Sequence, residues 1–577
     1  MTGAELAELL ETLRRIETDT ASVEAKRARH ELPKRLWETL SAFANSPGGG
    51  VLILGLEESS GFAASGVSDV KKVQADLGSL MGTMDPPLRA VIEAHRLEGV
   101  DLVVAEVPEL PAERKPCYYP GAGLTNGAFV RVADGDRKLS QYEVGLLLAA
   151  RSQPREDEQP EPRAHERDLD MELVEAILAR LRDRPGSVFR DLDDRTALET
   201  LRVLVPGEDG GLVPSVGGLL ALGRFPQQFF PALALTLVVY PTPRVGEPGP
   251  GGERFLDNAE VDGPIPRLVP RALDALRRNM RERSIVSGVG RQTLWEYPEV
   301  ALRESVVNAL AHRDLSAMAR GTPVQVQMFP DRLTITNPGG LFGPVTLDRL
   351  GEQGLAAARN QTLMKLLEDV PAPGEGGAVS ENRGSGIGAM LAALRHAGMS
   401  PPDFADRIAT FEVTFPNHTL LDEDTLRWLR SIDRELTDSQ RMALALLRRG
   451  EELDNASYRQ LTGLLDSRVA TRELADLVEA KLVRQEGTRR WASYRLAEFG
   501  NRDERPGDGR QRRDRRQDVL ELLQAGPLAR REIAESLGIE DAVATYWLRV
   551  LREEGRVAST ARLSRDPRTR YVLVDER

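Results

Sequence analysis

Two stretches of the 577-residue chain show no apolar periodicity, and they divide the rest into separate folding units. Residues 151–168 are rich in proline and charge, and residues 498–513 are rich in glycine and arginine. Segments of this composition cannot bury enough apolar surface to pack a core, so both are predicted to be linkers. At roughly 100–200 residues per domain, the chain length favours about three to five domains.

The linkers leave blocks of different character. Residues 1–150 combine helical and strand patterns, and residues 169–420 are long, mixed and punctuated by glycine. Residues 421–497 and 514–577 are short and helix-rich with basic ends, and they resemble each other in layout. We therefore expect an α+β multidomain protein whose C-terminal part carries a weak internal repeat.

Composition limits what the protein can be. The formal net charge is −12, so any surface that binds nucleic acid must be local. The single cysteine, Cys117, rules out an internal disulfide and a zinc site built from cysteines of one chain. Residues 1–17 show the pattern of an amphipathic helix rather than a signal peptide, and no stretch of about 20 apolar residues is present. We expect no membrane span and a cytoplasmic location.

A helix, a glycine turn and a strand follow one another in the first block. Residues 36–44 carry apolar side chains at helical spacing, residues 45–50 form a glycine-rich turn, and residues 51–56 are a continuous apolar run typical of a buried strand. The free N–H groups of a glycine turn can face phosphate, although most such turns only connect elements.

Several short motifs make the first block more specific. In chain order they are Asp19, Glu24 and Lys26 within TDTASVEAK, the AFAN sequence with its glycine triplet, Glu57, Glu58 and Gly61 after the strand, and GAFVRV at residues 127–132. In this order residues 1–150 resemble the Schlafen-type AlbA domain. Some members of that family are metal-dependent ribonucleases that use three carboxylates, and many bacterial relatives look like regulators.

The resemblance implies roles for four residues of this block. Asp19, Glu24 and Glu58 would hold Mg²⁺ or Mn²⁺, and Lys26 would neutralise the scissile phosphate. The first acid is Asp where the family usually has Glu, the third is Glu where it has Asp, and Ala25 replaces an aromatic residue. The alternative is a structural acid pair on a solvated strand. We expect nucleic-acid binding by this module, and cleavage stays open.

The central block contains a predicted amphipathic helix over residues 294–315. Glu304 and Asn308 are four residues apart and share one face of this helix. A carboxylate and an amide one turn apart could serve a water and a metal ion, and the alternative is a capping or surface pair.

Two glycine-containing segments follow this helix. Residues 332–336 alternate as a strand that runs into Asn-Pro-Gly-Gly at 337–340. Residues 382–390 place three glycines before a predicted helix, which is a plausible phosphate cradle because a helix N-terminus favours anions.

Together these elements resemble the ATP-binding domain of the gyrase–chaperone–histidine-kinase superfamily, a Bergerat-type α/β sandwich. They look most like the divergent branch found fused to Schlafen-type AlbA domains. The motifs that carry the resemblance are NALAHRDL at 308–315, RLTITNPGGL at 332–341, Arg359-Asn360 and RGSGI at 383–387. It extends back to about residue 170 through GGLLALGRFPQQFFP at 217–231. We therefore assign residues 169–290 to the middle region of an ATP module and residues 291–420 to its ATP-binding domain.

This resemblance implies that Glu304 would polarise the attacking water and that Asn308 would ligate a Mg²⁺ ion bridging the ATP phosphates. Asn337 would stand where the superfamily usually has an adenine-binding Asp, and its amide oxygen can still accept from the adenine amino group. The resemblance also implies that Gly339 would admit the base and that three glycines would wrap the phosphates, namely Gly384, Gly386 and Gly388. Whether ATP is hydrolysed stays open.

Both C-terminal segments show the order helix, turn, helix and β-wing, which is that of a winged helix. Residues 455–464 and 468–480 are predicted helices followed by a hairpin, and residues 529–574 repeat the pattern. Arginines on a wing suit phosphate and minor-groove contacts, whereas the alternative is a winged helix that docks protein. The residues expected to face DNA are Arg468, Arg472, Arg489, Arg490, Thr545, Tyr546, Arg549, Arg562 and Arg565.

These features favour an ATP-binding, nucleic-acid-binding protein that acts as an ATP-responsive DNA-binding transcriptional regulator. The alternative is an ATP-gated, metal-dependent nuclease acting on RNA or single-stranded DNA in defence against phage. A third hypothesis is a scaffold with both sites vestigial. A homodimer is expected, because full-length Schlafen nucleases enclose RNA between two similar halves and this chain carries one.

Overall fold

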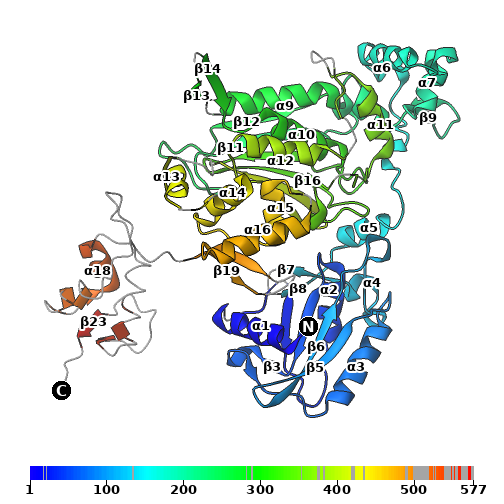
Figure 1. Cartoon of the computed structure of the whole chain (residues 1–577). Coiled ribbons are helices and arrows are strands. Elements are labelled where there is room, and N and C mark those ends of the chain that lie inside the picture. Colours follow the sequence, from blue (N-terminus) through cyan, green and yellow to red (C-terminus); the bar gives the residue numbers. More distant parts are fainter. Residues whose placement is uncertain are drawn as a thin grey trace. The chain divides into compact units, whose positions relative to one another are not determined.

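The computed structural model forms two compact units, Met1–Ala497 and Glu498–Arg577, which we describe separately (Figure 1). It describes the whole chain except residues 17, 21, 133–134, 281, 288–289, 353, 356, 373–376, 381–383, 418–422, 433, 435, 465, 488–491, 498–518, 521, 524–525, 527, 538–547, 549–550, 553–555, 560–569 and 574–577. In the described part, no helix is both long and apolar enough to cross a bilayer.

The N-terminal module is built on a four-stranded sheet in the order β1-β2-β6-β5. Its main elements are α1 (Gly3–Ile16), β1 (Val23–Lys26), α2 (Leu36–Asn45), β2 (Gly50–Leu54), α3 (Val70–Thr83), β5 (Val91–Leu97) and β6 (Val100–Val107). Strand side chains alternate between two cores. Leu52 and Leu54 pack with α2 and α3, whereas Val51 and Ile53 pack with α1. Helices therefore cover both faces of the sheet (Figure 1), which explains the continuous apolar run of β2.

The turn after α2 is fixed by side-chain hydrogen bonds. Gly48 and Gly49 have φ angles of 75° and 69°, in the left-handed region that favours glycine. The Asn45 side chain donates to the carbonyls of Cys117 and Phe129 at 2.9 and 2.8 Å and accepts from the Cys117 N–H at 2.7 Å. Asn45 therefore braces this turn against two distant segments of the module.

Short elements complete the N-terminal module. They are β3 (Leu56–Glu57), η1 (Glu58–Ser60), β4 (Ala63–Ala64), η2 (Ala112–Arg114), η3 (Pro120–Ala122), α4 (Leu124–Gly127), β7 (Phe129–Val132), β8 (Gly135–Lys138) and α5 (Gln141–Ala149). The following segment, for which the sequence suggests a linker, contains η4 (Glu156–Glu158) and η5 (Glu166–Asp168). Asp157 is buried there and accepts from the Leu363 N–H at 3.0 Å, so polar contacts hold this segment against the central module.

The central module has a six-stranded sheet in the order β12-β11-β15-β16-β18-β17. The strands are β11 (Leu235–Val239), β12 (Asp257–Val261), β15 (Val324–Met328), β16 (Arg332–Pro338), β17 (Asp403–Asp406) and β18 (Thr410–Pro416). The helices are α6 (Met171–Asp183), α7 (Asp194–Thr200), α8 (Val216–Leu222), α9 (Ile265–Asn279), α10 (Glu299–Ala311), α11 (Gln361–Asp369) and α12 (Gly386–His396). The remaining elements are η6 (Val188–Asp191), β9 (Leu204–Pro206), β10 (Leu212–Pro214), η7 (Pro226–Gln228), β13 (Glu282–Ser287), β14 (Gly290–Trp295) and η8 (Leu347–Arg349).

One hydrophobic core runs through this module. It extends from Ala164 to Phe415 and includes apolar side chains of α6, α8, α9, α10, α11 and α12. β11 pairs in parallel with β15, so the region before residue 290 and the region after it share one sheet. The helix predicted over residues 294–315 is shorter than predicted. It begins at Glu299, because Pro298 stands at its N-cap and Trp295 belongs to β14.

A small helical module follows the central sheet. It contains α13 (Glu423–Ser431), α14 (Asp438–Leu447), α15 (Asn455–Thr462), α16 (Ser467–Glu479), β19 (Val483–Glu486) and β20 (Ser493–Leu496). The side chains of Thr437 and Asp454 cap α14 and α15, and Leu444, Tyr458 and Leu474 lie in its core. The two predicted helices and the hairpin are present, and the winged-helix assignment stays a prediction.

The second unit has its own small core, formed in part by Val519, Leu523, Ile533 and Leu548. Its described elements are β21 (Leu528–Ala529), α18 (Arg530–Leu537), β22 (Val557–Ser559) and β23 (Arg570–Leu573), with sheet order β21-β23-β22. The DNA-facing residues predicted for this unit lie outside the described residues, and they are Thr545, Tyr546, Arg549, Arg562 and Arg565.

Candidate functional site

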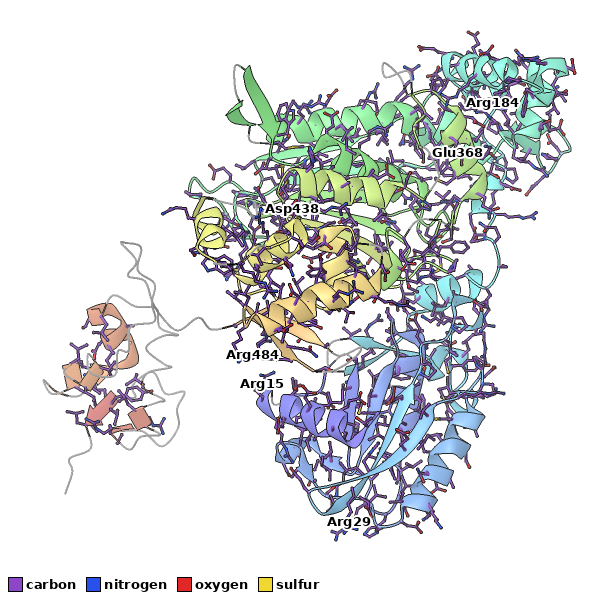
Figure 2. All side chains as sticks on the ribbon, viewed as in Figure 1. Arg15, Arg29, Arg184, Glu368, Asp438 and Arg484 are labelled. Carbon is purple, nitrogen blue, oxygen red and sulfur yellow. The ribbon has the colours of Figure 1, made fainter. Side chains whose placement is uncertain are left out.

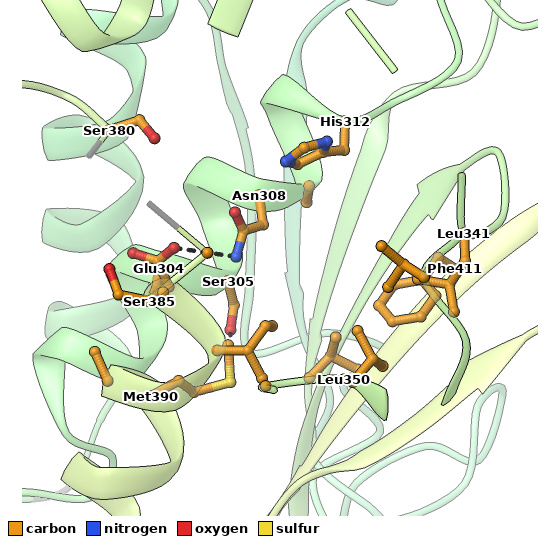
Figure 3. Close-up of a pocket in the computed structure, with 18 of the residues that line it drawn as sticks. Glu304, Ser305, Asn308, His312, Leu341, Leu350, Ser380, Ser385, Met390 and Phe411 are labelled. Atoms are coloured by element: carbon orange, nitrogen blue, oxygen red, sulfur yellow. Dashed lines mark hydrogen bonds between the residues drawn. The ribbon is translucent and has the colours of Figure 1, made fainter. Parts of the chain in front are cut away.

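A cavity of about 330 Å³ lies among α10, α12, the strands β16 and β18, and the loop that follows β16 (Figure 3). Drug-sized ligands occupy cavities of roughly 300–1,000 Å³. Figure 3 shows the polar side chains of Glu304, Asn308 and Ser385 at one end of the cavity and the apolar side chains of Leu341 and Phe411 at the other. The cavity therefore has separate regions for a charged group and for a flat apolar group.

The polar end contains the predicted pair on α10. The Asn308 Nδ2 donates to Glu304 Oε1 at 3.2 Å, as the dashed line in Figure 3 shows. This hydrogen bond orients the amide so that its Oδ1 is the atom that could ligate a cation. Helical spacing alone predicts that the two residues share a face, and the structure places both in the cavity wall.

The N-terminus of α12 lies directly against Glu304. A Cβ atom added at Gly386 would stand 1.7 Å from Glu304 Oε1 and 2.4 Å from its Cδ. Only glycine therefore allows the helix N-terminus to approach the carboxylate this closely. The sequence predicts a phosphate contact for Gly386, and its packing against Glu304 is an additional role that spacing could not reveal.

The other predicted phosphate-loop glycines differ in environment. Gly384 lines the cavity with a φ of 65°, in the left-handed region. Gly388 lies within the first turn of α12 but outside the cavity lining, and a Cβ there would meet nothing within 4 Å. The α12 N-cap, Ser385, makes no side-chain cap hydrogen bond, so the first-turn N–H groups and the helix dipole are suited to an anion.

Asn337 is a polar group of the apolar end. It lies on β16 with an exposed fraction of 6%, and its Nδ2 donates to the Pro338 carbonyl at 3.4 Å. Its Oδ1 is therefore the atom suited to accept from an amino group. Gly340 lines the cavity, whereas Gly339, the glycine that the sequence predicts at the base, packs against Asp314, with its Cβ position 3.1 Å from the Asp314 Cβ.

His312 lines the cavity near Asn308, and Arg359 lies behind the lining residues Gly340 and Phe342. Burial, with a contribution from the Arg359 charge, lowers the pKa of His312 to about 4, so the imidazole is neutral at pH 7. The Arg359 guanidinium is buried, donates to the Gly340 carbonyl at 2.9 Å and lies 5.5 Å from the Phe342 ring. Sequence reasoning assigned Arg359 no role, although the Arg359-Asn360 motif was the available signal.

The N-terminal module brings together all four of its predicted site residues. Asp19 and Glu24 are each 4% exposed, whereas Glu58 is exposed at the start of η1. Lys26 forms an ion pair with Glu24, and the Ala25 N–H donates to Asp19 Oδ1 at 3.1 Å. Burial, together with the charges of Glu24 and Glu58, raises the pKa of Asp19 to about 7. Ionised Glu24 and Glu58 disfavour the charged form of Asp19, because like charges repel.

Arg131 completes this cluster, and sequence reasoning missed it. Its guanidinium lies 2.5 Å from Glu24 and 3.0 Å from Asp136, and it donates to the Thr20 carbonyl at 3.1 Å. The Glu24–Arg131 contact is an ion pair without hydrogen-bond geometry, since Glu24 Oε2 has no hydrogen-bond partner. The available signal was the GAFVRV motif, which places this arginine on β7.

The donor set at this cluster does not fit a divalent cation as it is arranged. Among the described residues, no group of three or more His, Cys, Asp or Glu side chains is placed to hold a metal ion. Glu24 lies between the cations Lys26 and Arg131, which compensate its charge. The Arg131 side chain is 1% exposed and compensates the buried acids, whereas the Lys26 side chain is 37% exposed and can reach a phosphodiester. The raised pKa of Asp19 suits proton transfer.

The structure describes two of the four residues that are predicted to face DNA in the small helical module after the central sheet. Arg468 and Arg472 are exposed one turn apart on α16, and Arg489 and Arg490 lie outside the described residues. The tip of the hairpin contacts the N-terminal module, because the Gly487 N–H donates to Glu8 Oε1 at 2.7 Å. Arg468 and Arg472 are therefore the predicted DNA-facing residues of this module whose positions the structure describes.

Comparison with known families gives two matches. Residues 19–140 match the family described as Schlafen, AlbA_2, and residues 321–415 match HATPase_c_4, described as "Putative ATP-dependent DNA helicase recG C-terminal". The chain is therefore similar to Schlafen AlbA_2 domains in its N-terminal part and to HATPase_c_4 domains in its central part. The first match includes the whole acidic cluster, and the second includes Asn337 and the glycine segment but begins after Glu304 and Asn308.

Two solved structures are similar to the chain. One is the crystal structure of the DIP2311 protein from Corynebacterium diphtheriae, at 20% identity over 96% of this chain and 95% of that chain, with a TM-score of 0.35. The other is the solution NMR structure of the N-terminal domain of a putative ATP-dependent DNA helicase RecG-related protein from Nitrosomonas europaea, at 33% identity over 23% of this chain and 91% of that chain, with a TM-score of 0.20. No curated protein matches the chain.

The family description mentions a helicase, but the cavity described above is not a P-loop. A P-loop requires a Gly-Lys pair before Ser or Thr, and the sequence contains no Gly-Lys dipeptide. The cavity instead uses a helical carboxylate–amide pair and a glycine-rich helix N-terminus.

Proposed function

We propose that this protein is an ATP-responsive, DNA-binding transcriptional regulator. The observation that carries the proposal is the single cavity that joins Glu304 and Asn308 to the glycine N-terminus of α12 at one end and holds Asn337 at the other. That arrangement offers groups for a triphosphate and for the amino group of adenine in one place. The regulator role extends this ATP-binding core with nucleic-acid contacts on the flanking modules.

In this proposal, different residues of the cavity bind the phosphates, the metal ion, a water molecule and the base. The first-turn N–H groups of α12 would donate to the phosphates, and Asn308 Oδ1 would hold the Mg²⁺ that neutralises their charge. Glu304 would orient a water, and Asn337 Oδ1 would accept from the base. Neutral His312 adds no positive charge to the wall, so selectivity for the base comes from the amide.

The flanking modules supply the nucleic-acid contacts in this proposal. Arg468 and Arg472 on α16 would contact duplex DNA, and the half-exposed Lys26 at the acidic cluster would contact a phosphodiester. A homodimer would place two copies of each surface in one assembly, and sedimentation at micromolar concentration with and without ATP tests this.

Cleavage of RNA or single-stranded DNA is the second candidate, in the defence role that the sequence suggests. One observation favours it, namely the pKa of Asp19 at about 7 beside Glu24 and Lys26. A carboxyl with that pKa exchanges protons readily at neutral pH, as a general acid or base must. Incubating the protein with RNA and DNA, with and without ATP and Mn²⁺, separates a nuclease from a binding platform.

The nucleotide role has a direct test. Calorimetry should show ATP binding in the presence of Mg²⁺, and Asn308→Ala should weaken it about tenfold or more, because one charge-assisted contact is worth roughly 1.5–3 kcal/mol. In EDTA, without Mg²⁺, the difference in ATP affinity between wild type and Asn308→Ala should be smaller. Equal affinity of wild type and variant with Mg²⁺ present would refute the role assigned to Asn308.

A further inference from the structure

The loop between β1 and α2 concentrates positive charge. Residues 26–35, with the sequence KRARHELPKR, contain five Lys or Arg residues and one acidic residue, Glu31, in a chain whose net charge is −12. The loop begins at Lys26, which is already part of the acidic cluster. Positive charge therefore continues from the cluster along the neighbouring surface.

Hydrogen bonds bring a second pair of lysines to the same loop. The Ser68 N–H and hydroxyl donate to the Arg29 carbonyl at 2.8 and 2.5 Å. Because the hydroxyl hydrogen is used there, His30 Nδ1 is the donor in its 2.9 Å contact with Ser68 Oγ. Ser68 lies just before α3, so Lys71 and Lys72 in the first turn of that helix stand beside the loop.

Exposure and pairing distinguish the members of this surface. Arg29, Lys34, Lys71 and Lys72 are exposed, and the part of the chain that the structure describes offers none of the four an ion-pair partner. We call these four residues the basic loop surface. Figure 2 shows Arg29 at the outer edge of the N-terminal module.

Uncompensated like charges repel one another, so the basic loop surface does not stabilise the fold. Repulsion of this kind is relieved when a polyanion replaces the missing counter-charges and releases its own condensed ions. The surface consists of long, exposed basic side chains around a loop, which suits a regularly charged sugar–phosphate backbone.

We propose that the basic loop surface binds the sugar–phosphate backbone of a single nucleic-acid strand and leads it to the cluster of Asp19, Glu24, Lys26 and Arg131. The proposal rests on the nucleic-acid binding proposed above and specifies where the phosphates lie on the N-terminal module. Backbone contacts of this kind fix position and carry no base sequence information, so binding here is insensitive to sequence.

The test uses the full-length protein and a fluorescently labelled single strand of one sequence, made both as RNA and as DNA. Anisotropy is measured between about 50 and 200 mM salt, where phosphate contacts dominate the change in affinity. The variant carries Arg29→Gln, Lys71→Gln and Lys72→Gln. Each lost phosphate contact lowers the slope of log affinity against log salt by about 0.7 for a single strand, so the variant slope should be shallower by about 2.

A matched control removes the same charge from another exposed surface. Arg224, Arg244 and Arg278 in the central module are exposed, and no ion pair involves them among the residues with described placement. The triple change of these residues to Gln should leave affinity and slope like those of wild type. An equal loss in both variants would mean that net charge alone governs binding and would overturn the proposal.

The remaining outcomes are also decisive. If wild type binds the strand and the loop-surface variant binds with the same slope, the inference is wrong while nucleic-acid binding itself stands. If wild type binds neither strand at the lowest salt, both the inference and the proposed binding by this module fail. If polyglutamate of matched charge displaces the strand as effectively as unlabelled RNA does, the surface recognises acidic protein instead.

Discussion

Gly386→Ala isolates the contact between α12 and Glu304. The added Cβ would lie 1.7 Å from Glu304 Oε1 and 3.0 Å from its Cγ, whereas real Cβ atoms essentially never approach other heavy atoms within 3.0 Å. The carboxylate or the helix N-terminus must therefore move by more than about 1 Å. The Asn308–Glu304 hydrogen bond is already 3.2 Å long, so a displacement of that size breaks it.

The expected result is a loss of Mg²⁺-dependent nucleotide affinity without loss of folding. Losing the orientation of one metal-ligating amide should weaken Mg²⁺-ATP binding by about 10- to 100-fold, which corresponds to roughly 1.5–3 kcal/mol. Binding measured in EDTA should change much less. Because alanine favours a helix over glycine by about 1 kcal/mol, the unfolding temperature should fall little or not at all.

Gly388→Ala is the matched control on the same helix, since a Cβ there meets nothing within 4 Å. This variant should bind ATP like wild type and gain up to about 1 kcal/mol in stability. If Gly386→Ala and Gly388→Ala bind Mg²⁺-ATP equally well, the reasoning that ties Gly386 to the carboxylate is refuted.

Two further predictions concern the buried acid and the contact between modules. Burial raises the pKa of Asp19 from 3.8 to about 7, so its ionised form destabilises the folded state, and this cost grows as pH rises from about 4 to 7. Asp19→Asn should therefore be more stable than wild type at pH 8, with the difference vanishing near pH 4; urea unfolding that shows no such pH dependence would contradict the shifted pKa. The Tyr142 hydroxyl donates to Asp314 Oδ2 at 2.8 Å across the contact between the N-terminal and central modules, so Tyr142→Phe should cost about 1–2 kcal/mol. Tyr118→Phe, which removes the more exposed 2.6 Å bond to Asp85, is its control, and equal losses in the two variants would argue against a special role for the module contact.

Local sequence was sufficient for elements whose pattern is local. The apolar spacing of residues 36–44 and the apolar run after it predict α2 and β2, because side chains repeat at 3.6 residues in a helix and alternate in a strand. The same periodicity places Glu304 and Asn308 on one face of α10, and the glycine motif marks the start of α12. These features depend on residues only a few positions apart, so the sequence alone predicts them.

Tertiary structure alone decided which distant groups share one environment. Arg131 pairs with Glu24 across more than a hundred residues of chain, and Gly386 lies against Glu304 from another helix. No local pattern specifies such partners, because a buried charge can be compensated by any opposite charge that folding brings near it. The shift in the pKa of Asp19 has the same origin, since burial and the proximity of other carboxylates exist only after the chain has folded.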